Sequence, residues 1–350
     1  MSGTALSTHA RARRPRGSML LRVVERSFLV VAIALLFVLF WRISPAWMNG
    51  QTVQFVVAQS APLEVVTVGM TIAMISGNID LSPGSMLSLS GMVMGLVYER
   101  TASLWLGLLV GLALCLLVGA ATGLLVGRLR ISAIVVTLAT FIWAAGLATA
   151  INSANAIQMT GSVLRVLNAG TSGWTVAIGV VVFAYVVGHL LLVRTKFGKY
   201  SRAIGGNLEF ARRAGVPVQR YVLYVFLFMS LTIWIGTVMS VAQLGAAQPL
   251  AGSGLELQAI VAVVIGGTRL TGGEGSMWRS ALGALLLAVL GQGLSSLGLS
   301  DAYYSLWEGV AVIVVLALSV VLQRAVRRGA SRATAIGPRA AVEGTSLEVA

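Results

Sequence analysis

The side chains of this chain that could do chemistry are acids inside or beside apolar stretches. Glu64 lies within an apolar run, just after Pro62, and Asp80 lies in the polar break "GNIDLSPG". Ionisable groups cost free energy in lipid, so they mark candidate proton, ion or substrate sites. Three further acids lie in Gly-rich breaks or near the ends of apolar runs: Glu256, Glu274 and Glu308. A proton- or sodium-coupled carrier would need such an acid at the bilayer midplane, and only Glu64 is expected to lie deep.

Asp80 also has a structural interpretation. It precedes Ser82, Pro83 and Gly84, where an acidic side chain commonly caps a turn or a helix start. We favour this turn role over a contact with a substrate.

Enzyme signatures are absent from the sequence. It contains no G-x-x-x-x-G-K-[ST], no H-E-x-x-H and no G-x-S-x-G motif. The two histidines, His9 and His189, lie far apart in the sequence, and the single cysteine, Cys115, excludes an internal disulfide and a Cys-based metal cluster. We expect no catalysis by this chain alone, no metal and no cofactor.

A polar segment, "YSRAIGGNLEFARRAGVPVQRY", interrupts the apolar chain at residues 200–221. Asn207 is suited to an N-cap, Gly215 to the position after a helix, and Pro217 prevents continuation, which predicts a short helix over 208–214. Such a helix could lie at the lipid headgroups. Its apolar face is small, however: Leu208, Phe210, Ala211 and Ala214. We therefore favour a docking surface for a soluble partner.

The elements that position these residues are membrane helices. The 350 residues are 57% hydrophobic and 10% charged, with a mean hydropathy of +0.90, whereas soluble domains carry about 25% charged residues. The net charge of +14 could indicate a nucleic-acid binder. The basic residues, however, lie at the termini and between apolar runs, as orientation signals do. We expect the lipid bilayer, and no nucleic acid, as a partner.

Ten apolar segments are candidate membrane helices. Two are short and flanked by Gly- or Pro-containing breaks, 85–98 and 255–268, as in broken or re-entrant transporter helices. The other eight are 27–44, 54–76, 103–127, 132–151, 174–193, 221–242, 276–298 and 303–323. With ten crossings and a cytoplasmic N-terminus, 22 of the 25 basic residues face the cytoplasm, which fits the positive-inside rule.

The sequence therefore predicts an all-α polytopic membrane protein of about ten transmembrane helices, with both termini cytoplasmic. We expect a basic leader over 1–26, a transmembrane domain over 27–323 and a disordered tail over 324–350. Within the transmembrane domain, the segment 194–220 forms the middle cytoplasmic loop.

Two patterns concern packing. Small residues recur at every fourth position from Gly107 to Gly127, and this row is expected to wind around its helix and meet more than one neighbour. The stretches "ISGNIDLSPGSM" (75–86) and "IGGTRLTGGEGSM" (265–277) resemble one another, which leaves an internal repeat and a chance likeness of Gly-rich segments equally open.

Three stretches carry a resemblance to a known family: "DLSPGSMLSLSG", "RTKFGKYSRAIGGNLEFARRAGVPV" and "ELQAIVAVVIGGTRLTGGEGSMWRSALGALLLAVLGQGL". In order and spacing they resemble the permease subunits of bacterial ABC importers for monosaccharides, the ribose, xylose, galactose and autoinducer-2 type. The resemblance covers most of 50–323. It implies a multi-pass protein of the bacterial inner membrane that carries out no covalent chemistry.

The resemblance also implies partners. A cytoplasmic ABC ATPase would dock on a coupling helix in the middle loop, a second permease subunit would complete a homo- or heterodimer, and a periplasmic solute-binding protein would deliver the solute. The external loop 152–172 and the stretch 243–254 become candidate docking surfaces for that binding protein. Carried over by position, the coupling contacts are Ala203, Ile204, Gly205, Gly206, Asn207, Glu209, Arg212 and Gly215.

Two positions depart from the family pattern. Gly77–Asn78 stands where a small pair is usual, and Glu64 stands where many members have a neutral residue. The side chains of Asn78 and Glu64 could each face the translocation path or a neighbouring helix. Together with Asp80, they are the candidate path residues. The main hypothesis is an ATP-driven sugar importer, and the alternatives are a nucleoside or autoinducer-2-like solute in the same architecture, or an ion-coupled carrier. Bulky β-branched residues at Gly205 and Gly206 are expected to uncouple ATPase docking while leaving membrane insertion intact.

Overall fold

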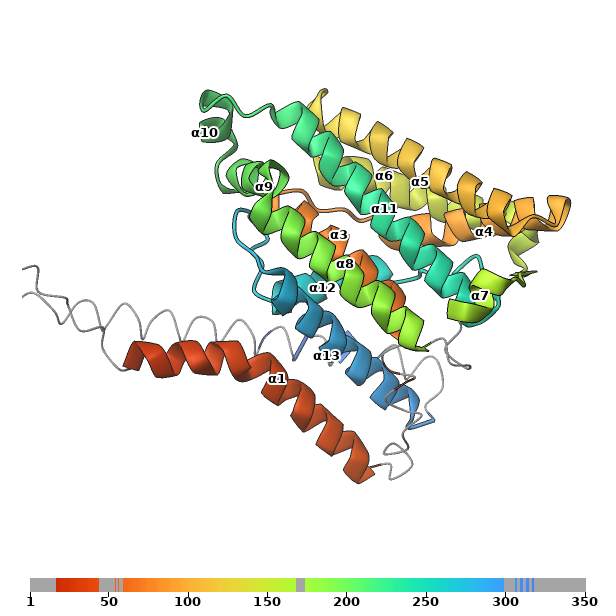
Figure 1. Cartoon of the computed structure of the whole chain (residues 1–350), viewed down its shortest axis with the longest axis horizontal. Helices are drawn as coiled ribbons and strands as arrows, with labels where there is room; N and C mark the ends of the chain where they lie inside the picture. Colours follow the sequence, from red (N-terminus) through yellow and green to blue (C-terminus); the bar gives the residue numbers. More distant parts are fainter. Residues whose placement is uncertain are drawn as a thin grey trace, which may run out of the picture.

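The computed structural model describes residues 17–43, 59–167 and 174–298, with isolated positions outside these ranges. It is built almost entirely from helices (Figure 1). The long helices are α1 (Gly17–Ile43), α3 (Ala61–Ile75), α4 (Pro83–Thr101), α5 (Leu104–Gly127), α6 (Ala133–Ala150), α8 (Trp174–Arg194), α11 (Val218–Leu244), α12 (Leu255–Ile265) and α13 (Met277–Ser295). The short elements are η2 (Ile151–Ala154), α7 (Ser162–Leu167), α9 (Lys196–Gly206), α10 (Leu208–Arg213) and two strands, β1 (Ile157–Gln158) and β2 (Ala246–Ala247).

Five of the described helices are long and apolar enough to cross a membrane: α5, α6, α8, α11 and α13. Shorter apolar helices cover 27–43, 61–75 and 255–265. The chain is thus a polytopic helical membrane protein, as predicted. The segment 303–323, predicted to be the last span, is described only at isolated positions.

Three helices differ from the predicted bounds, and a fourth was not predicted. Helix α3 begins at Ala61, after a turn at Ser60, and not at 54. The segment 85–98 belongs to a longer helix, because α4 begins at Pro83 and continues to Thr101. Helix α1 begins at Gly17, inside the segment assigned to the basic leader. Helix α9 was not predicted at all, because the basic residues over 194–202 conceal an amphipathic pattern.

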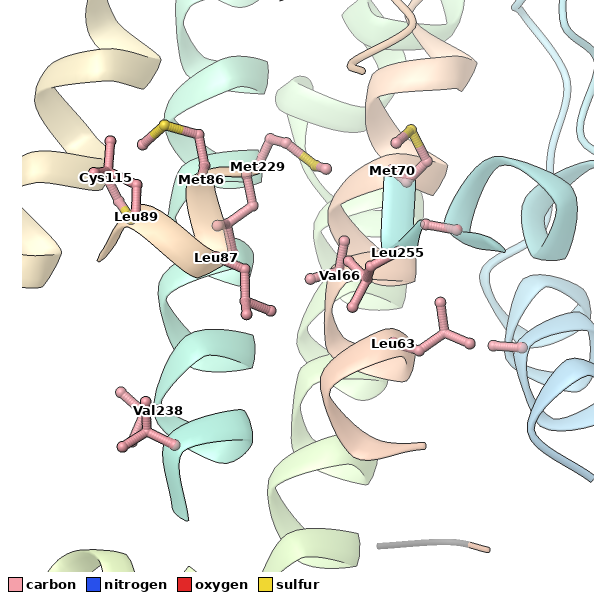
Figure 2. Close-up of a cluster of buried hydrophobic side chains, with 14 of the residues drawn as sticks. Leu63, Val66, Met70, Met86, Leu87, Leu89, Cys115, Met229, Val238 and Leu255 are labelled. Carbon is pink, nitrogen blue, oxygen red and sulfur yellow. The ribbon is translucent and has the colours of Figure 1, made fainter. Parts of the chain in front are cut away.

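Helix α3 is the centre of the bundle. All of its residues are buried, and it contacts α8, α11, α12 and α13. Leu63, Val66 and Met70 of α3 belong to the main hydrophobic cluster, together with side chains of α4, α11 and α12 (Figure 2). An apolar helix without a polar face is expected only where other helices surround it.

The row of small residues on α5 packs against two helices in turn. A side chain at Gly107 would meet the Met94 carbonyl of α4 at 2.8 Å, and one at Gly123 would meet Leu223 Cα of α11 at 2.8 Å. This confirms the prediction that the row winds from one neighbour to another, because its small residues let two backbones approach closely.

The two ends of the bundle carry different structures. Figure 1 shows α9 and α10 together at one end and α7 at the other. At the α7 end, β1 pairs with β2 in an antiparallel register, Ile157 with Ala247 and Gln158 with Ala246. This pairing joins Ile157–Gln158 to Ala246–Ala247, and these strands lie within 152–172 and 243–254, the two candidate docking surfaces for a binding protein.

Candidate functional site

The helix predicted in the polar segment is present as α10. The Asn207 side chain accepts a hydrogen bond from the Phe210 backbone N–H at 2.9 Å, which caps the helix start. Gly215 has a φ of +77°, the left-handed conformation that glycine adopts readily after a helix. Glu209 and Arg213 form an exposed ion pair at 3.3 Å. These caps hold a helix that has only six residues.

The predicted coupling residues divide into an exposed set and an inner set. The exposed residues are Gly206, Asn207, Glu209, Arg212 and Gly215. Ala203 and Gly205 are half-buried, and Ile204 is buried in a cluster with Ala211, Val218 and Val222. The exposed set is open to a partner, and buried Ile204 packs α9 against α10 and the start of α11.

Helix α9 attaches this site to the membrane helices. Its Phe197 packs against Phe228 of α11 with ring centroids 6.2 Å apart, and Tyr200 meets Tyr221 edge-on at 4.7 Å. Arg202 donates a hydrogen bond to the Leu192 carbonyl of α8 at 3.3 Å. The apolar residues Phe197, Tyr200 and Ile204 recur at helical spacing, and this is the signal that could have predicted α9 from the sequence.

The end of α9 touches two polar breaks of the bundle: the first break, 76–82 between α3 and α4, and the second break, 266–276 between α12 and α13. A side chain at Gly205 would overlap the Ile75 carbonyl and would lie 2.8 Å from the Gly273 N and 2.9 Å from the Gly77 N. A side chain at Gly272 would lie 2.9 Å from Gly205 Cα. The Gly273 N–H donates to the Ile75 carbonyl at 2.8 Å, so the two breaks are also bonded to each other. We call Gly77, Gly205, Gly272 and Gly273 the glycine junction.

The two helices that lead into the junction end in the same turn. After α3, Asn78 N–H donates to Ala73 and Gly77 N–H to Met74; after α12, Thr268 N–H donates to Val263 and Gly267 N–H to Val264. Gly77 and Gly267 have φ values of +79° and +85°. Both turns are Schellman motifs in the same register, so the likeness of 75–86 to 265–277 extends to backbone structure at this turn.

Asn78 faces its own turn and a cavity. Its amide donates to the Ser76 hydroxyl at 2.9 Å. It also lines a cavity of about 540 Å³, the junction cavity, together with Arg130, Asn207, Arg212 and Thr271. Of the three candidate path residues, Asn78 is therefore the one that lies beside the coupling residues.

Asp80 serves as a turn cap. Its Oδ1 accepts hydrogen bonds from the Ser82 N–H at 2.8 Å and the Ser82 hydroxyl at 2.7 Å. The neighbouring residue Leu81 donates a backbone hydrogen bond to the Thr137 hydroxyl of α6 at 3.1 Å, which ties this segment to α6. This is the turn role favoured from the sequence, and the Thr137 contact satisfies the Leu81 N–H beside the membrane helices.

Glu64 faces a neighbouring helix. Its carboxylate accepts a hydrogen bond from the Tyr185 hydroxyl of α8 at 2.7 Å, and only 6% of the residue is exposed. Tyr185 in turn stacks on Trp278 of α13 at 6.3 Å. The sequence left two positions open for Glu64, facing the translocation path or facing a neighbouring helix. The Tyr185 contact favours the neighbouring helix.

The remaining candidate acids are Glu256, Glu274 and Glu308. Glu274 pairs with Arg269 at 3.1 Å within the second break. Glu256 is buried in the first turn of α12, against Gly84. Glu308 lies outside the described residues.

Sequence reasoning missed the residues that complete this site. Gly77, Gly272 and Gly273 join the coupling segment only through tertiary contact, although "GGTRLTGG" already marked a Gly-rich break. Thr137 carries no sequence signal, because threonine is common in membrane helices.

Comparison with known proteins gives a family. Residues 52–320 match the family described as "Branched-chain amino acid transport system / permease component". The ribose import permease protein RbsC of Escherichia coli K12 is 30% identical over 302 residues, 83% of this chain and 92% of the relative. The L-arabinose transport system permease protein AraH of the same strain is 32% identical, over 75% of this chain and 80% of the relative. The ribose import permease protein RbsC of Bacillus subtilis is 31% identical, over 79% and 87%.

No solved structure matches the chain significantly. The relatives named here are permeases and not enzymes, which agrees with the absence of enzyme motifs. Since the family match spans most of the sequence and the relatives are aligned over most of their length, this chain belongs to the family of transport-system permease components.

Proposed function

We propose that the chain is the transmembrane subunit of an ATP-driven importer for a small neutral sugar. The relatives named for ribose and L-arabinose transport support the solute class. The observation that carries the mechanism is structural: an exposed, capped helix, α10, continues from α9, whose end packs into the glycine junction between both polar breaks. A soluble ATPase docked on α10 would thereby act on α3 and α12 together.

The mechanism requires no covalent chemistry from this chain. When the ATPase subunits close or separate, α10 and α9 would move as a unit, because Asn207 caps α10 directly after α9 ends. The junction has little room for sliding, since backbone touches backbone without intervening side chains. A displacement of α9 would therefore shift the ends of α3 and α12 and change access to the membrane interior.

The same proposal sets the orientation and the other partners. The α10 end faces the cytoplasm, as do both termini, and ten helices cross the bacterial inner membrane. At the opposite end, the paired strands β1 and β2, within 152–172 and 243–254, would form part of the surface on which a periplasmic solute-binding protein docks. A second permease subunit completes the transporter.

Reconstitution tests this function. Proteoliposomes containing the chain, its ATPase and its solute-binding protein are expected to take up D-ribose or L-arabinose only with ATP, and omitting either partner should abolish uptake. Nucleosides, autoinducer-2 and leucine, offered as competitors, separate the other solute classes. Uptake by the chain alone would contradict the proposal and favour a self-sufficient carrier.

Glu64→Gln distinguishes the importer from an ion-coupled carrier. We expect ATP-dependent uptake to stay within about twofold of wild type, because the amide oxygen of the introduced glutamine could still accept the Tyr185 hydrogen bond, a contact of about 1 kcal/mol. A carrier that moves protons through Glu64 would lose its transport. The measurement is initial uptake with and without an imposed pH gradient. Tyr185→Phe serves as the control, since it removes the hydrogen bond and keeps the acid.

A further inference from the structure

A second cavity lies at the end of the bundle opposite α10. It has a volume of about 370 Å³ and is lined by the start of α3, the ends of α11 and α13, and the start of α12. Four glutamine side chains from four segments border it: Gln59, Gln243, Gln258 and Gln292. We call this space the glutamine cavity. It is separate from the junction cavity, with which it shares no lining residue.

The chemistry of the lining is polar and uncharged. Serine hydroxyls at Ser60, Ser240 and Ser295 add to the four amides, and no acidic or basic side chain is among the described lining residues. An amide offers two donors and an acceptor, and a hydroxyl offers one donor and two acceptors. Each C–OH group of a sugar needs both kinds of partner, whereas an amino acid brings a carboxylate and an ammonium that would find no charged side chain among these residues.

The position of these amides calls for an explanation. Polar side chains within membrane helices usually face the bundle interior or a water-filled cavity, because they are costly against lipid. The four glutamines come from four different segments, yet they converge on one space. Its size falls at the lower end of the range for small-molecule sites, about 300–1,000 Å³.

We infer that the glutamine cavity is a binding site for a neutral polyhydroxylated solute within a single permease subunit, reached from the face opposite the ATPase. This inference rests on the proposed function, and it adds a site for the transported sugar inside this chain. Gln258 and Gln292, from α12 and α13, are expected to hydrogen-bond the solute across the cavity.

Cysteine accessibility in the assembled importer tests the site. Because Cys115 is the only cysteine and is buried, Cys115→Ala provides a background for Gln258→Cys and Gln292→Cys. A membrane-impermeant thiol reagent added from the outside is expected to modify both variants, and saturating D-ribose or L-arabinose, whichever is taken up, should slow modification at least threefold. Gln219→Cys, exposed at the start of α11 near the α10 end, is the matched control and should not react from outside.

Sugar uptake is a second measurement, which does not depend on cysteine labelling. Gln258→Leu is expected to lower sugar uptake about fivefold to tenfold, as loss of one substrate hydrogen bond predicts, while ATPase binding is unchanged. If wild-type importer takes up sugar but Gln258→Leu keeps wild-type uptake, or sugar does not protect a cysteine that reacts, or leucine protects it instead, the cavity is not the sugar site although the proposed function stands. If wild-type importer takes up neither sugar, the proposed function itself fails, and this inference with it.

Discussion

Gly205→Ala is expected to reduce ATP-dependent uptake at least tenfold, while Gly206→Ala leaves uptake close to wild type. The added methyl group at Gly205 would overlap the Ile75 carbonyl and crowd the backbone nitrogens of Gly77 and Gly273. At Gly206 it would meet Gly273 Cα at 3.9 Å, an ordinary contact. Overpacking of this kind costs about 1–3 kcal/mol and displaces the backbone, so the junction would no longer hold α9 against both breaks.

The two variants are matched in their place on the helix. Both glycines are the last residues of α9, so alanine changes helix propensity equally at the two positions. Initial uptake is measured beside ATPase co-purification, which Gly205→Ala should preserve because α10 itself is untouched. Equal uptake by the two variants would contradict the role of the junction in coupling α9 to the two breaks. Loss of ATPase binding by Gly205→Ala alone would also contradict it. This changes the expectation from sequence, in which bulky residues at Gly205 and Gly206 both disrupt ATPase docking: the contacts place Gly205 alone against the two breaks.

Phe210→Ala is expected to weaken ATPase binding about 30-fold or more. Phe210 is 69% exposed on α10, a helix whose other exposed side chains are Leu208 and the charged Glu209, Arg212 and Arg213. Exposed aromatic side chains at docking sites often contribute about 2 kcal/mol or more to binding, which corresponds to that ratio. The affinity of purified ATPase for the chain in detergent or nanodiscs measures the effect.

Arg213→Gln is the control on the same helix. It removes an exposed ion pair with Glu209, and such pairs contribute about 0.3–0.5 kcal/mol, so the binding constant should change less than about threefold. A Phe210→Ala variant that binds as tightly as wild type would show that the ATPase docks elsewhere.

Local signals in the sequence predicted much of the helical structure. Asn207, Gly215 and Pro217 fixed the limits of α10 because capping depends on residues next to one another. The long apolar runs predicted α5, α6, α8, α11 and α13 for the same reason. Asp80 was correctly assigned to a turn, since its partner is Ser82.

Contacts between distant segments escaped prediction. Nothing beside Gly205 in the sequence indicates that Gly77 and Gly272 lie against it, because close backbone approach follows from how α3, α9 and α12 pack. Likewise, Gln59 and Gln292 are isolated polar residues in the sequence, and only the packing of the helices brings them to one cavity. Glu64 was ambiguous for the same reason: its partner, Tyr185, lies on a helix far along the chain.

Photo-cross-linking from α10 tests the central claim most directly. A photoreactive benzoylphenylalanine placed at position 210 of the assembled importer is expected to cross-link to the ATPase. The same group at position 250, where Leu250 is 68% exposed at the opposite end of the bundle, should not. Cross-linking from position 210 to lipid alone, or to the ATPase from position 250, would contradict the assignment of α10 as the helix through which ATP hydrolysis acts on the membrane domain.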